Sequence, residues 1–141
     1  MIDVINLQRK VKLETAIYKK FVKELSDSVD EAKDKTFSVA FVSDDRMWKL
    51  NSTFRGKNLT TDVLSFPQEA EPHDQPDFLG DIVISVDQAQ KQAKENNLTL
   101  ENETKQLILH GLLHLCGYDH ETDKGEMNKR ELALRKKLKI N

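Results

Sequence analysis

The chain has 141 residues, of which 38% are hydrophobic and 33% charged, and its formal net charge is −2. This length suits one domain with a substantial core, and no stretch approaches the roughly 20 apolar residues that a membrane span needs. The small net charge gives no overall indication of nucleic-acid binding. A single cysteine excludes an internal disulfide and, with a start that lacks a signal-peptide pattern, predicts a cytoplasmic protein.

Basic residues are distributed unevenly along the chain. No lysine or arginine lies between Lys57 and Lys91, whereas both are frequent near the two ends. Such asymmetry fits either a basic face for a polyanion or the solvated sides of amphipathic helices, and the pattern alone does not separate the two.

Hydrophobic periodicity predicts nine regular elements. In chain order they are a strand over 2–7, a helix over 14–29, a strand over 37–43, a helix from Ser43 to about 55, a strand over 62–67, a strand over 79–85 buried on both faces, and helices over 86–96, 100–116 and 123–138. All three prolines fall in 67–77, which predicts a surface loop there. The set favours a single α+β domain over 1–141, with one mixed sheet of about four short strands and about five helices, or a mixed α/β sandwich with one sheet.

The most informative segment is 110–120, which reads HGLLHLCGYDH. His110 and His114 are four residues apart, so on a helix they face the same way, one turn apart. Gly117 can end that helix in a left-handed turn, and His120 then returns toward the pair. Three histidines in this arrangement predict a divalent-metal site with an open fourth position, on a helix that is apolar nearly all round and therefore buried.

Gly111 distinguishes this segment from the metzincin zinc motif, which carries a glutamate at the same position. That glutamate is the general base of metalloproteases, and a glycine cannot replace it. The sequence therefore disfavours ordinary proteolysis. Gly111 also allows another backbone or a substrate to approach the helix closely, at a cost of roughly 1 kcal/mol in helix propensity.

Three segments together resemble the YbeY family of bacterial endoribonucleases, also called rRNA maturation factors. They are 50–67, LNSTFRGKNLTTDVLSFP, then 79–85, LGDIVIS, and the histidine segment 110–120. The match runs in order over most of 37–131. Thr60 departs from the family pattern, which usually has proline there, and this difference is expected to loosen the turn into the following strand without touching the chemistry.

The resemblance implies a metal-dependent endoribonuclease specific for single-stranded RNA, acting in small-subunit rRNA maturation and ribosome quality control. It implies His110, His114 and His120 as ligands of one metal ion per chain, usually zinc, with nickel or another divalent ion as the alternative. It further implies that Arg55 acts in the active site together with His114, and that ribosomal proteins or assembly GTPases are partners. An arginine there would contact the phosphate and offset charge in the transition state.

Other side chains around these motifs have two interpretations each. Without the resemblance, Arg55 would be interpreted as a helix-end arginine paired with an acid such as Asp62. Asp119 either orients a ligand histidine or accepts a proton, or it is a turn residue that supports the reversal after Gly117. The weaker candidates are Lys57 as an RNA contact or a solvated lysine, Asp81 and Ser65 as partners of the ligands or structural residues, and Tyr118 as a base-stacking ring or a ring packed against the helix end. His73 is interpreted as a surface residue.

Two further functions remain open at this stage. The missing glutamate favours a non-catalytic, zinc-stabilised module for ribosome assembly or RNA binding. The modest net charge is compatible with a metal hydrolase acting on a small phosphoester or amide. The sequence predicts neither the cleavage site nor the general base, the oligomeric state or a requirement for the ribosome.

Overall fold

The computed structural model describes residues 4–68, 77–119 and 123–141. Its elements are β1 (Val4–Asn6), α1 (Thr15–Ser28), the 3-10 turn η1 (Asp30–Ala32), β2 (Thr36–Val42), α2 (Asp44–Arg55), β3 (Val63–Pro67), β4 (Phe78–Ser85), α3 (Val86–Glu95), α4 (Leu100–Leu115) and α5 (Glu126–Leu138). The α+β prediction of one mixed sheet with five helices is confirmed. The short turn η1 was not predicted, because three residues are too few to show a periodicity.

The sheet has the strand order β1-β2-β4-β3. β1, β2 and β4 run parallel, whereas β3 is antiparallel to β4 and forms one edge. Ile82 of the central strand β4 pairs with Val39 of β2 on one side and with Ser65 of β3 on the other. Ile82 and Ile84 are fully buried and Val83 nearly so, which confirms the prediction of a strand buried on both faces.

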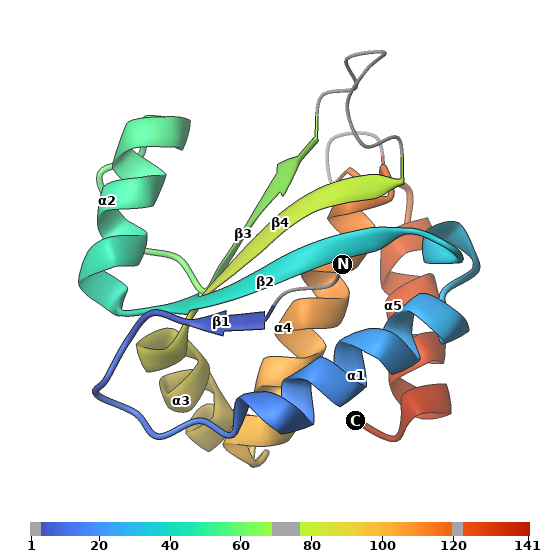
Figure 1. Ribbon diagram of the computed structural model, residues 1–141, viewed down its shortest axis with the longest axis horizontal. Coiled ribbons are helices and arrows are strands. Elements are labelled where there is room, and N and C mark those ends of the chain that lie inside the picture. Colours follow the sequence, from blue (N-terminus) through green and yellow to red (C-terminus); the bar gives the residue numbers. More distant parts are fainter. Residues whose placement is uncertain (1–3, 69–76, 120–122) are drawn as a thin grey trace.

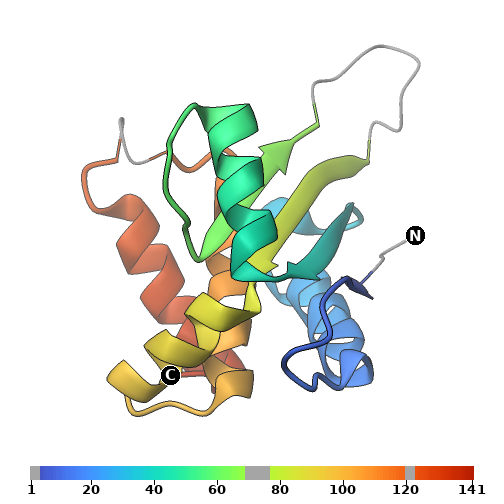
Figure 2. The ribbon, with the colours of Figure 1, turned by 90° about the vertical axis from the view of Figure 1, so that its left-hand side faces the viewer.

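Helices cover both faces of the sheet (Figures 1 and 2). α2 lies alone on one face, where Met47 packs with Val42, Leu64 and Val83 in a small cluster. The larger core lies on the other face, between the sheet, α1 and α4, and α5 packs against α4 from outside. Along β3 and β4, successive residues therefore point to different layers.

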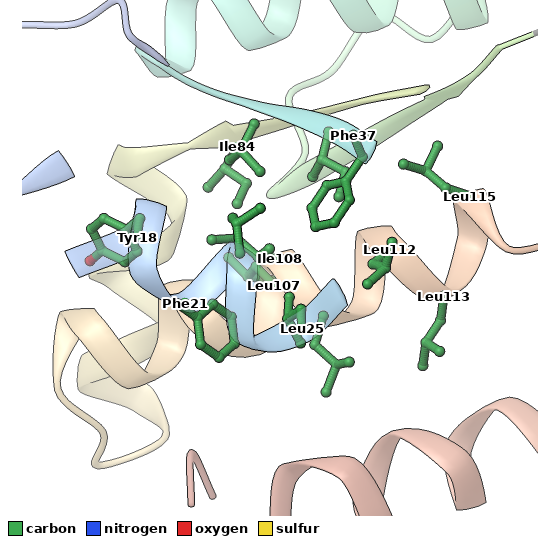
Figure 3. Close-up of a cluster of buried hydrophobic side chains, with 14 of the residues drawn as sticks. Tyr18, Phe21, Leu25, Phe37, Ile84, Leu107, Ile108, Leu112, Leu113 and Leu115 are labelled. Atoms are coloured by element: carbon green, nitrogen blue, oxygen red, sulfur yellow. The ribbon is translucent and has the colours of Figure 1, made fainter. Parts of the chain in front are cut away.

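α4 is the central helix of the larger core. Figure 3 shows Ile108 and Leu112 directed toward Ile84 and Phe37 of the sheet, with Leu25 of α1 close by. Ten of its sixteen residues are buried, as the nearly uniform apolar pattern predicts. The helix that carries His110 and His114 is thus held on several sides by packed side chains.

Short polar signals mark the helix ends. Ser43 and Thr99 cap α2 and α4, accepting hydrogen bonds from the backbone N–H groups of Arg46 and Asn102. Gly117 adopts a φ of +102°, so the expected left-handed turn after α4 is present. No helix in the described ranges combines the length and apolarity needed to cross a bilayer.

Candidate functional site

A cavity of about 700 Å³ opens beside the edge strand β3. Its walls come from the end of α2 and the following loop, from β3, and from the last turns of α4 with the turn after it. The lining side chains singled out by the sequence are Arg55, Lys57, Ser65, His110, His114, Tyr118 and Asp119. Segments more than 50 residues apart in the chain therefore meet in one cavity.

The two described histidines of the motif converge within this cavity. Nε2 of His110 and Nε2 of His114 lie 3.2 Å apart, and the two rings meet at 74°. Two nitrogens bound at about 2.0–2.1 Å to one tetrahedral zinc ion would lie roughly 3.3–3.4 Å apart. The spacing of this donor pair therefore fits two ligands of one metal ion. The expected third ligand, His120, lies outside the described residues, and the described ones contain no group of three His, Cys, Asp or Glu side chains suited to a metal.

The second ring nitrogen of His110 contacts a carboxylate from α5. Nδ1 of His110 lies 2.6 Å from Oε1 of Glu131, and Arg135 donates from Nη2 to the other oxygen, Oε2, over 2.5 Å. Burial raises the pKa of Glu131, but the hydrogen bond and charge of His110 and the charge of Arg135 together hold it below the ordinary value. The carboxylate is therefore ionised at neutral pH and acts only as an acceptor.

Gly111 lies where α4 touches the sheet. A Cβ atom at this position would lie 2.8 Å from Cγ2 of Ile82 and 3.2 Å from Oγ of Ser65. The Ser65 hydroxyl donates to the carbonyl oxygen of Gly111 over 3.1 Å, so Ser65 ties β3 to α4. The close neighbours of Gly111 are side chains of the sheet, not another backbone or a substrate as the sequence suggested, and position 111 has no room for a glutamate side chain.

Arg55 and Lys57 line the cavity from the exposed end of α2 and the loop that follows it. Gly56 between them takes a left-handed φ of +66° and ends α2. The buried Asn51 donates from Nδ2 to the carbonyl oxygen of Leu59 over 2.8 Å, which fixes the loop. Within the described part of the chain, Asp62 is paired with Gln92 rather than with Arg55, so the alternative ion pair is not formed.

Thr60 anchors the start of this wall. Its hydroxyl donates to Oδ1 of Asp44 over 2.5 Å, and Asp44 also accepts from Ser85 and Gln88. The threonine hydroxyl thus makes a hydrogen bond that a proline side chain cannot make, and it links this wall to the first residue of α2.

The turn after α4 is fixed from the side of the core. The hydroxyl of Tyr118 donates to Oε2 of Glu31 over 2.8 Å, and Arg130 donates to Oε1 of Glu31 over 2.9 Å. The Arg130 hydrogen bond is the main reason why the pKa of Glu31 is lowered. Tyr118 is thus held by its hydroxyl as well as by packing, and Asp119 follows it on the cavity wall.

Some sequence candidates lie elsewhere. Asp81 accepts a hydrogen bond from Ser38 and belongs to the alternation of β4 that faces away from α4, so the structure does not bring it to the histidines. His73 falls outside the described residues. Burial, followed by the charge of Glu31, raises the pKa of Cys116 to about 11, so its thiol stays protonated and is a poor metal ligand.

Glu131 and Arg135 are the site residues that the sequence analysis missed. They are four residues apart on an amphipathic helix, which is a common surface ion-pair spacing, and nothing in the spacing connects them to His110. A signal was nonetheless present, since Glu131 falls on the same face of α5 as the buried Met127 and Leu134. An acid on an apolar helix face is a candidate for a buried partner.

The mixed sheet and the histidine-lined cavity at its edge define a class of small α+β protein whose candidate site is built on a core helix. Comparison with known proteins gives a narrower result. The family model described as endoribonuclease YbeY matches residues 3–139.

Individual relatives agree with this match. The endoribonuclease YbeY of Nautilia profundicola is 47% identical over 84% of this chain and 84% of its own length. The protein of the same name from Thermodesulfovibrio yellowstonii is 39% identical over 91% of this chain and 89% of its own. A solution structure of a Thermotoga maritima protein has the same fold, with a TM-score of 0.65 and 30% identity over 94% of this chain and 85% of its own. The chain therefore belongs to the endoribonuclease YbeY family.

Proposed function

We propose that this protein is a zinc-dependent endoribonuclease that cleaves single-stranded RNA during small-subunit rRNA maturation and ribosome quality control. The observation that carries the proposal is the convergence of the His110 and His114 Nε2 atoms, 3.2 Å apart, in a cavity that also contains Arg55 and Lys57. Family membership supports RNA as the substrate. The expected partners are ribosomal proteins or assembly GTPases, and the expected location is the cytoplasm.

In this proposal, His110, His114 and His120 hold one zinc ion, with nickel or another divalent ion as the alternative. When bound, the ion supplies Lewis-acid chemistry and lowers the pKa of a coordinated water. Arg55 binds and orients the scissile phosphate through its forked guanidinium group and offsets negative charge as the phosphodiester is cleaved. Lys57 adds a second positive charge on the same wall.

The remaining residues of the cavity shape the substrate site. Asp119, on the turn after α4, is a candidate proton acceptor or partner of a ligand histidine. Because Gly111 faces Ile82 and leaves no room for a carboxylate, the base cannot come from the position used in metalloproteases. A phosphodiester depends more on charge stabilisation than on such a base, which is why the arrangement favours RNA over peptide bonds.

The proposal is tested with single-stranded and duplex RNA of the same sequence. Purified protein is compared with a His114→Ala variant prepared identically, and zinc content is measured in both. Cleavage of the single strand by the wild-type protein alone is expected. Equal cleavage by both proteins would identify a contaminating nuclease.

One observation favours a second function, a zinc-stabilised module that binds the ribosome without cleaving RNA. Position 111 is packed against the sheet, and no base stands there. This alternative predicts that zinc removal lowers the melting temperature while neither protein cleaves any RNA. Cleavage above the His114→Ala background would exclude it.

A further inference from the structure

The Glu131–Arg135 pair on α5 stands directly behind the histidine cavity. The side chain of Glu131 is 8% exposed, and both carboxylate oxygens are engaged, Oε1 by His110 and Oε2 by Arg135. Arg135 donates to one oxygen of this carboxylate over 2.5 Å, and a carboxylate paired with a guanidinium accepts hydrogen bonds, so the group that faces its other oxygen is a donor. Nδ1 of His110 is therefore the nitrogen that carries hydrogen in the neutral ring.

This contact determines which ring nitrogen of His110 carries the hydrogen and which carries the lone pair. A neutral imidazole carries one hydrogen, so hydrogen on Nδ1 leaves the lone pair on Nε2. Nε2 is the atom that lies 3.2 Å from Nε2 of His114. Glu131 thus directs the Nε2 lone pair of His110 toward His114.

The surroundings explain why such control is needed. His110 borders two cavities, the one that contains Arg55 and a second one of about 520 Å³ that Glu131 and Arg135 also line. Without the carboxylate, water in the second cavity would face Nδ1 and could either donate or accept. The ring would then lose the preference for hydrogen on Nδ1 that the carboxylate imposes.

We propose that Glu131, itself oriented by Arg135, is a positioning residue that fixes the tautomer and orientation of His110 for metal binding. This proposal rests on the proposed function, because it takes His110 to be a ligand of a divalent metal. Carboxylates that hold a ligand histidine in this way typically contribute 10- to 100-fold to metal affinity. Both carboxylate oxygens of Glu131 contact His110 and Arg135, so Glu131 acts through His110.

The first test uses Glu131→Gln, which preserves shape and removes charge. The positive guanidinium of Arg135 is expected to keep the amide oxygen, so the amide NH₂ faces Nδ1 of His110. The neutral ring should then shift its hydrogen to Nε2. Long-range proton–nitrogen NMR of the metal-free protein reports the tautomer directly, without any activity measurement.

The second readout is zinc affinity, measured by competition with a chromophoric chelator. Glu131→Gln is expected to bind zinc roughly 10- to 100-fold more weakly than wild type. Adding Arg135→Leu to this variant releases the amide oxygen to accept from His110, so part of the affinity and of the wild-type tautomer should return. A purely structural ion pair would predict the opposite, a further loss.

Glu101→Gln is the matched control. Glu101 forms an ion pair with Lys105 over 2.9 Å at the same four-residue spacing, on the first turn of α4. This change should leave both the His110 tautomer and the zinc affinity at wild-type values. If Glu131→Gln matches Glu101→Gln in both readouts, or alters only the melting temperature, the positioning role is refuted.

The outcomes also separate this inference from the proposed function. Equal zinc binding by wild type and His114→Ala would overturn the metal site, whereas the tautomer measurement would still decide whether Glu131 controls the ring. Normal metal binding together with an unchanged Glu131→Gln variant would overturn the positioning role alone.

Discussion

Replacing Gly111 by alanine tests how closely α4 must approach the sheet. The added Cβ would lie 2.8 Å from Cγ2 and 3.3 Å from Cγ1 of Ile82, and 3.2 Å from Oγ of Ser65. Ile82 is fully buried in the central strand and β-branched, so it cannot rotate away easily. One of the two elements must therefore move.

The magnitude follows from two opposing effects. Inserting a methyl group into a packed core costs about 1–3 kcal/mol, while replacing glycine by alanine in a helix returns about 1 kcal/mol. The balance of these two effects is a loss of up to about 2 kcal/mol in the free energy of unfolding on Gly111→Ala, measured by urea denaturation followed by circular dichroism. Ile82→Ala removes the two contacting atoms of Ile82 and leaves only the 3.2 Å contact with Ser65, so most of the penalty should disappear in that background, as a double-mutant cycle would show.

Ala133→Gly provides the calibration. Ala133 is exposed on α5, so this change measures the propensity difference in the same protein without any contact to the sheet. If Gly111→Ala stabilises the protein by about the amount that Ala133→Gly destabilises it, the close approach has no energetic significance and the reasoning is refuted.

Further predictions concern the cavity and its supports. Arg55→Ala should reduce RNA cleavage by about 100-fold or more while zinc stays bound; unchanged cleavage with full metal content would remove Arg55 from the mechanism. Chelation should lower the melting temperature and added zinc should restore it, whereas His114→Ala should show no such response. The Arg130 hydrogen bond is the main reason why folding lowers the pKa of Glu31 from 4.5. The ionised Glu31 therefore stabilises the fold above pH 4.5, and this stabilisation is lost as the pH falls through the lower pKa of the folded state. The stability difference between wild type and Glu31→Gln should therefore shrink on acidification, and a constant difference would contradict this. With its pKa raised to about 11, Cys116 should react with iodoacetamide at pH 8 far more slowly than glutathione does; equal rates would contradict its burial.

The fold was predictable where the chain shows a strong period or a clear cap. Apolar spacing located α1 and α4, and Ser43 and Thr99 marked helix starts because their side chains compete for backbone N–H groups. The sheet order was not predictable, since no local sequence pattern indicates that β3 pairs antiparallel with β4 at an edge of the sheet. Strand pairing depends on long-range contacts between faces that look alike in sequence.

The site was predictable only where its residues are close together in the chain. The spacing of His110 and His114 predicted their shared face, and their Nε2 atoms do converge. Asp81 does not reach the histidines, because it alternates with Ile82 along β4 and lies on the opposite face of the sheet. Glu131 was missed because it reaches His110 from another helix, 21 residues further along the chain.

The contacts that support the turn after α4 have a consequence for the order of biosynthesis. Tyr118 is fixed by Glu31, 87 residues earlier, and Glu31 is in turn held by Arg130, 99 residues later than itself. While the chain is being translated, α1, the sheet and α4 emerge before α5 is available to dock. The support of this turn by Glu31 and Arg130 is therefore complete only after α5 has left the ribosomal tunnel and docked.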